Sequence, residues 1–152
     1  MTTKALLLVF FMLVATPFMA IADETDALKK KIVLDQKRLV IMENMEFSEN
    51  EAKGFWPLYD KYQEELFLVN QRAAKLIVAY ASVYQTLADD QALKIVDEHF
   101  GIRSDRQKIM QEFAGDLKKI LSGKRVFRYL QVENKIEAIA RFELARGIPL
   151  AQ

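Results

Sequence analysis

His99 is the one histidine of the chain, and it directly follows Asp97 and Glu98, so this is the place where acid–base or metal chemistry could occur. A metal site needs several converging ligands, and the sequence has neither an H-E-x-x-H segment nor a cysteine to join this histidine. Serine hydrolysis is disfavoured too, because the serines have one histidine to share and none follows a strand in a G-x-S-x-G elbow. The sequence therefore predicts no enzyme, no metal and no cofactor, and we expect a binding function.

The most distinctive side chains lie in residues 47–62, FSENEAKGFWPLYDKY. The candidate partner-binding or corner residues are Phe55, Trp56, Pro57, Tyr59 and Tyr62. Three of these aromatic residues are three or four positions apart, so they share one face of a helix. They could form an exposed binding patch, or they could be core residues where the helix bends, because an interior proline removes a hydrogen bond and kinks a helix. Aromatic residues at helical spacing are more often packed than exposed. The sequence therefore favours a shape-setting corner, in which Pro57 kinks or restarts the helix and Trp56 fills the bend.

Two polar features leave alternatives open. Within Glu133-Asn134-Lys135 the polar residues interrupt an apolar face, which indicates either a polar network that fixes helix register or an exposed face with pairs such as Glu137–Arg141. Basic clusters, such as Lys118-Lys119 and Lys124-Arg125, would either line a concave binding surface or lie on solvated helix faces.

Helices must position all of these residues. Gly and Pro are few, with 5 and 3 residues, and apolar residues recur three or four apart through most of the chain. We expect an all-α fold, an antiparallel long-helix hairpin of about four helices with a Pro kink in the second. The first helix is predicted to start near Leu28, the second at Phe47-Ser48, the third to span 89–121 and the fourth to follow Ser122-Gly123 and end at Gly147. The third is marked by an apolar pattern at Leu93, Val96, Phe100, Met110, Ala114, Leu117 and Leu121.

Two of the predicted helices begin with related segments. Ser48 and Glu51 have the spacing of a capping box, in which each side chain accepts a hydrogen bond from the other residue's backbone N–H. The second start has Leu87 and Gln91 at the matching positions but an alanine in place of the capping hydroxyl, so Asp89 or Thr86 would have to cap it.

The N-terminal residues 1–22 have the layout of a secretory signal peptide: Lys4, an apolar run over 5–15, Pro17 and the small-residue exit Ala20-Ile21-Ala22. We expect cleavage after Ala22, export and a single helical domain over 23–152, with no stable membrane insertion after cleavage. An uncleaved membrane anchor is the alternative.

Charge and cysteine content narrow the function further. Lys4 is the only charged residue before the predicted cleavage point, so 21 basic and 21 acidic residues remain after it. A neutral balance argues against non-specific nucleic-acid binding, which rests on excess Lys and Arg. The chain has no cysteine, so packing rather than disulfides must hold the exported domain.

The two helix starts, Phe47–Glu51 and Leu87–Gln91, resemble L-T-x-x-Q, the motif of the Spy/CpxP-like periplasmic proteins. The segments EAKGFWPLYDKY (51–62), KLIVAY (75–80) and QVENKIEAIARFELARGIPL (131–150) resemble an uncharacterised branch of exported helical proteins grouped with that family, over essentially the whole mature chain. The resemblance implies a mostly helical, often dimeric, curved hairpin that acts in the periplasm. Better-known members are ATP-independent chaperones or modulators of envelope-stress sensors. The implied partners are unfolded client proteins or one dedicated envelope partner such as a sensor domain, with a homodimer as the expected assembly.

Overall fold

The computed structural model describes residues 22–152 and contains four helices and no strand in that part of the chain. The prediction of an all-α protein is therefore confirmed. Nearly all of the predicted signal peptide, residues 1–21, lies outside the described residues. The chain divides into two compact units, with a boundary between Glu46 and Phe47. This boundary lies within the stretch 23–152 that the sequence analysis treats as one domain.

The described part of the first unit consists of the helix α2, Ala22–Met45. The helix begins six residues before the predicted start at Leu28. It ends where Glu46 adopts a φ of 47°, and the Glu46 N–H donates to the Met42 carbonyl at 3.1 Å. A residue in the left-handed region stops a helix because it turns the chain away from the helical path.

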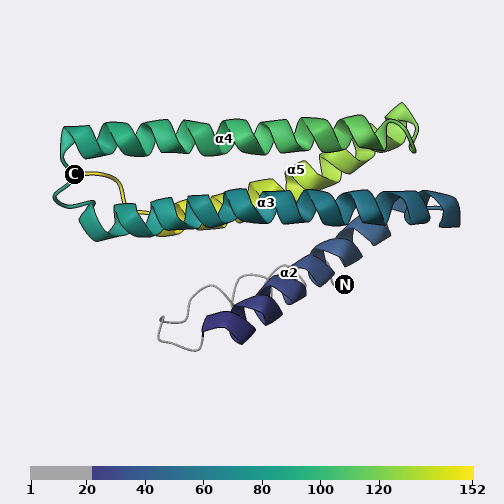
Figure 1. Ribbon diagram of the computed structural model, residues 1–152, viewed down its shortest axis with the longest axis horizontal. Coiled ribbons are helices and arrows are strands. Elements are labelled where there is room, and N and C mark those ends of the chain that lie inside the picture. Colours follow the sequence, from purple (N-terminus) through teal and green to yellow (C-terminus); the bar gives the residue numbers. More distant parts are fainter. Residues whose placement is uncertain (1–21) are drawn as a thin grey trace. The chain divides into compact units, whose positions relative to one another are not determined.

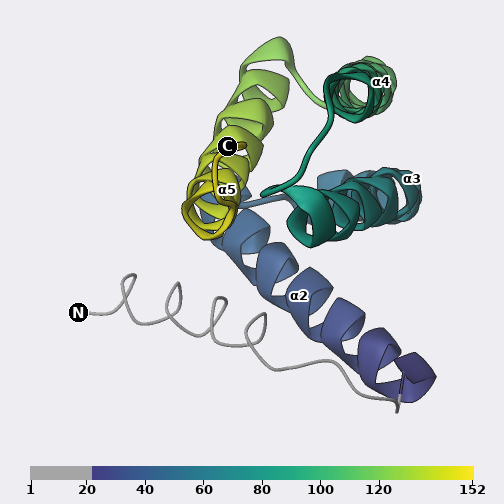
Figure 2. The same ribbon diagram turned by 90° about the vertical axis from the view of Figure 1, so that its left-hand side faces the viewer.

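The second unit holds three long helices, α3 (Glu49–Val83), α4 (Asp89–Leu117) and α5 (Gly123–Gly147). Figures 1 and 2 show α3 and α4 side by side and running in opposite directions, with α5 crossing obliquely beside them. The third predicted helix ends four residues early, at Leu117 rather than Leu121. The helical hydrogen-bond pattern changes there, because the N–H groups of Lys119 and Ile120 donate to the carbonyls of Asp116 and Leu117, three residues back, at 3.0 and 3.1 Å.

The turn after α4 lies against the first turns of α3. A Cβ placed on Gly54, the Gly of the GFWP run, would lie 3.4 Å from the Ile120 side chain, which is van der Waals contact, so Gly54 faces this turn.

The core of the second unit is an aromatic cluster contributed by all three helices, Phe55, Tyr59, Tyr62, Phe113 and Tyr129. Each of these side chains is at most 4 % exposed. The Tyr62 and Phe113 rings stack with centroids 4.3 Å apart, and the Phe113 and Tyr129 rings meet edge to face at 5.3 Å. Such ring pairs add stabilisation beyond the area they bury, so this cluster is the main apolar link between α3, α4 and α5.

Candidate functional site

The predicted aromatic site divides into buried and exposed residues. Phe55 and Tyr59 are 0 % exposed and Tyr62 is 2 % exposed, so these three belong to the aromatic cluster and present no surface to a partner. Trp56 is half-buried against Phe55 and Tyr59, with centroid distances of 5.1 and 5.5 Å, and Pro57 is exposed. The three buried rings are therefore packed in the core and form no exposed binding patch.

Pro57 lies inside α3, which continues without a break to Val83. The helix therefore does not restart at the proline, and the expectation of a restart is wrong. Proline fixes its own φ near the helical value, so an exposed interior position can accommodate it at the cost of one backbone hydrogen bond. The predicted kink at this residue stays a prediction.

The two helix starts differ in their caps. Ser48 is the N-cap of α3, where the Ser48 N–H donates to Glu51 Oε2 at 2.9 Å and the Glu51 N–H donates to Ser48 Oγ at 3.4 Å. The Ser48 hydroxyl also donates to Glu51 Oε2, at 2.9 Å. The hydrogen bonds that the Ser48 N–H and then the Ser48 hydroxyl donate to this carboxylate, together with the charge of Arg125, hold the pKa of Glu51 below its usual value. Phe47 precedes the cap and packs on Phe55 with ring centroids 4.5 Å apart.

At the start of α4 the N-cap is Ala88 itself, which corrects the expectation that Asp89 or Thr86 would serve. An alanine side chain can accept no hydrogen bond, so the first arm of the box is missing. The second arm is present, because the Ala88 N–H donates to Gln91 Oε1 at 3.3 Å. Leu87, the hydrophobic residue of this motif, is half-buried just before the cap.

Glu133 is a buried acid that the sequence pattern did not predict to be a core residue. Glu133 is 4 % exposed and accepts hydrogen bonds from the hydroxyls of Tyr62 at 3.4 Å and Tyr129 at 3.3 Å. Burial, and then the charge of Glu133, raise the pKa of both tyrosines. The polar-network interpretation therefore fits Glu133, whereas Asn134 and Lys135 are exposed. Position 133 shares a helical face with Tyr129, which is the signal that could have revealed it.

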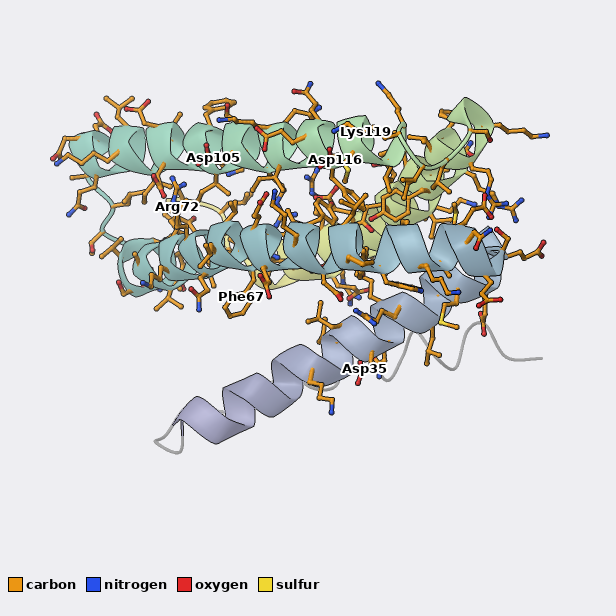
Figure 3. The ribbon with its side chains drawn as sticks, turned by 45° about the vertical axis from the view of Figure 1, so that its right-hand side comes forward. Asp35, Phe67, Arg72, Asp105, Asp116 and Lys119 are labelled. Atoms are coloured by element: carbon orange, nitrogen blue, oxygen red, sulfur yellow. The ribbon has the colours of Figure 1, made fainter. Side chains whose placement is uncertain are left out.

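Three arginines connect the helices of the second unit in pairs. Arg72 on α3 binds Asp105 at 2.5 Å and Glu98 at 3.0 Å on α4, and Figure 3 shows Arg72 and Asp105 across the space between these helices. Arg106 and Arg125 form the ion pairs that connect α5 to the other two helices.

Arg106 on α4 binds Glu137 on α5 at 2.6 Å, and Arg125 on α5 binds Glu51 on α3 at 2.7 Å. Glu137 also takes the predicted pair with Arg141, at 2.7 Å. Because both ion pairs between helices are partly shielded from water, they fix helix register more firmly than exposed pairs do.

Two members of the basic clusters form ion pairs with acids of the second unit. Arg125 is committed to Glu51, and Lys119 binds Asp116 at 2.7 Å near the end of α4 (Figure 3). That contact lowers the pKa of Asp116. His99 is exposed, and the described residues contain no group of three or more His, Cys, Asp or Glu side chains placed to hold a metal ion.

The exposed apolar residues of α4 form the most distinctive surface. Leu93, Val96 and Phe100 are 65 %, 46 % and 63 % exposed, and we call these three residues the apolar stripe. They lie at i, i+3 and i+7, so they share one face over about two turns. In the sequence they belong to the apolar pattern that predicts this helix. The core side is instead marked by the buried residues Ile102 and Phe113, which lie on the opposite face of α4.

Other exposed apolar side chains are spread over the helices beside α4. On α3 and α5 they are Leu68, Val78, Phe127, Ile139, Phe142 and Leu144, each at least 42 % exposed. In the second half of α5 they occupy more than one face. Single exposed apolar residues are common on protein surfaces, whereas groups of them indicate interaction sites.

No family model, curated protein or solved structure matches this chain. The resemblance to Spy/CpxP-like proteins therefore stays a prediction. Among the described helices, none combines the length and the apolar character needed to cross a membrane.

Proposed function

We propose that this chain is a periplasmic protein-binding protein that holds other polypeptides reversibly and without a nucleotide, as an ATP-independent chaperone or envelope-stress protein does. The observation that carries the proposal is the set of exposed apolar side chains on α4 and α5, led by the apolar stripe. These side chains alternate with charged residues along the same helices.

A mixed apolar and charged surface suits reversible binding. Charged groups speed the encounter with a polypeptide of opposite local charge, and short apolar patches give contacts weak enough for release. Apolar side chains on several faces would let clients of different sequence bind in different ways. After the predicted cleavage, 21 basic residues balance 21 acidic ones, so such binding would not depend on clients of one charge sign.

The test is the suppression of aggregation of an unfolding client enzyme by the purified mature protein. We expect less light scattering as the protein is added, and a weaker effect from the double variant Leu93→Ser/Phe100→Ser. Unchanged scattering at several-fold molar excess would rule out the chaperone version of the proposal.

A second candidate is an accessory that docks one dedicated envelope partner, such as a sensor domain. The compactness of the apolar stripe favours it, because three residues bordered by Asp90, Asp97 and Arg103 form a small apolar patch with a charged rim. A crosslinked pull-down from the periplasm separates the two candidates. One stoichiometric partner supports the accessory, and a spread of unrelated proteins supports the chaperone.

The proposal includes three finer expectations: cleavage after Ala22, a homodimer, and an antiparallel hairpin kinked at Pro57. Sequencing of the secreted protein should give an N-terminus at Asp23. An intact N-terminus in a membrane fraction would instead favour an uncleaved anchor. Sedimentation of the mature protein measures its assembly directly, and a monomer at all concentrations would remove the homodimer. Replacing Pro57 by Ala should straighten α3, and unchanged helix content, assembly and partner binding would leave the proline no role beyond packing.

A further inference from the structure

We propose that the apolar stripe of α4 docks one amphipathic helix of a partner protein, and that this helix carries Lys or Arg along one edge. The inference rests on the proposed protein-binding function and deepens it by stating the chemistry of the partner.

The shape of the stripe points to a helical occupant. Leu93, Val96 and Phe100 stand in one row along α4, with the buried Ile102 on the opposite side of the helix. Apolar side chains at i, i+3 and i+7 form the stripe along which one helix packs against another. An extended peptide would match this row poorly, because alternate side chains of a strand point to opposite faces.

The charges beside the stripe point to a basic edge. Asp90 and Asp97 are seven residues apart, so they lie along the same edge of α4 next to the apolar row. Asp97 forms no ion pair with any residue that the structure describes, whereas Asp90 has a long contact with Lys94 at 3.6 Å. Both aspartates are exposed to water, so a partner's cation can reach either carboxylate.

The acid next to Asp97 in the sequence does not share this role. Glu98 is directed towards α3, where it binds Arg72 at 3.0 Å. The other edge of the stripe carries His99 and Arg103, both exposed, so the basic residues of the partner must lie on one edge only. This asymmetry fixes the direction in which the partner helix lies along α4.

Fluorescence anisotropy of a labelled synthetic peptide tests the proposal on the purified mature protein. The peptide is an amphipathic helix of about five turns, long enough to cover the stripe, with Leu at i, i+3 and i+7 and Lys along one edge. Two control peptides carry Glu in place of the Lys residues, or the same composition in scrambled order. Circular dichroism of each protein variant checks that its helix content is retained.

We expect saturable binding of the Lys-edged peptide, weakened by added salt, and much weaker binding of both controls. Phe100→Ser should weaken binding roughly tenfold, as truncation of a central apolar anchor does. Asp97→Lys should weaken binding of the Lys-edged peptide several-fold and improve binding of the Glu-edged peptide. Leu150→Ser, which alters an 87 % exposed leucine beyond the end of α5, should leave binding unchanged.

Equal binding of the scrambled peptide, or no effect of Phe100→Ser, would overturn the proposed docking site. If the peptide fails to bind while aggregation suppression persists in Phe100→Ser, the docking inference falls and the proposed function stands. If neither the peptide nor any client or periplasmic partner binds, the proposed function itself is wrong.

Discussion

Phe113 and Phe100 are the same residue type on the same helix, yet Phe113 is 4 % exposed and Phe100 is 63 % exposed. They are thirteen residues apart on α4, about three and a half turns, so they point to opposite sides. Phe113 stacks with Tyr62 and joins the aromatic cluster, whereas Phe100 has one neighbouring ring, His99, among the described residues. The comparison shows that α4 has two apolar faces, one that is packed in the core and one that is exposed.

Truncating each phenylalanine in turn should separate the two faces most strongly. We expect Phe113→Ala to lower the free energy of unfolding by about 3–5 kcal/mol, because it removes a buried ring and leaves a cavity. Phe100→Ala should change it by no more than about 0.5 kcal/mol, as exposed substitutions usually do. Urea unfolding of both variants gives the two values. Equal losses would show that the two faces of α4 contribute equally to the free energy of unfolding.

Alkaline pH should weaken the aromatic cluster in particular. The pKa values of Tyr62 and Tyr129 are raised in the folded protein, by burial first and by the charge of Glu133 second. The unfolded chain therefore loses protons above pH of about 10 that the folded chain keeps. The contribution of these tyrosines is constant below that pH. Above it the free energy of unfolding should fall by about 1.4 kcal/mol per pH unit for each tyrosine.

Tyr62→Phe removes one of the two tyrosine hydroxyls that titrate. The free energy of unfolding of this variant should therefore fall less steeply above a pH of about 10 than that of the wild type. Urea unfolding at a series of alkaline pH values measures the slopes. The slope is the readout because the lost hydrogen bond to Glu133 changes the stability at every pH. Identical slopes would mean that Tyr62 keeps an ordinary pKa in the folded protein.

Exchanging the two N-caps should have a smaller effect, of opposite sign at the two helix starts. Ser48→Ala removes an accepting side chain at the start of α3 and should lower the free energy of unfolding by about 1 kcal/mol. Ala88→Ser supplies the missing arm at the start of α4, beside the apolar stripe, and should raise it by about 0.5–1 kcal/mol. Thermal unfolding of both variants measures the changes. A loss of stability in Ala88→Ser would show that the missing N-cap side-chain hydrogen bond does not limit the stability of this helix start.

The smallest effect on stability is expected from Leu93→Ser in the apolar stripe. A leucine that is 65 % exposed contributes little burial to the fold, so the free energy of unfolding should change by less than about 0.5 kcal/mol. The same substitution should reduce client or peptide binding. Calorimetry supplies the stability, and a loss greater than 1.5 kcal/mol would place Leu93 in the core.

Local features of the sequence predicted local structure well. The box of Ser48 and Glu51 could be recognised because its hydrogen bonds join residues three positions apart. Periodicity likewise predicted the helices and the stop at Gly147, since both depend on neighbours in the chain.

The choice of buried face could not be predicted, because it depends on contacts between helices. The pattern Leu93, Val96 and Phe100 is as regular as the pattern that includes Ile102 and Phe113, and only packing against α3 and α5 selects the second. Glu133 was read as part of a polar segment for the same reason, since its partner Tyr62 is 71 positions away.

Hydrogen–deuterium exchange of the full mature protein, with and without the Lys-edged peptide, tests most directly whether one part of α4 packs in the core and another binds a partner. We expect slow exchange around Phe113 and Tyr129 in both conditions. We expect faster exchange over residues 93–100, with protection gained there when the peptide is added. Equally slow exchange over both segments without the peptide, and no change on its addition, would contradict the claim that one face of α4 serves the fold and the other serves binding.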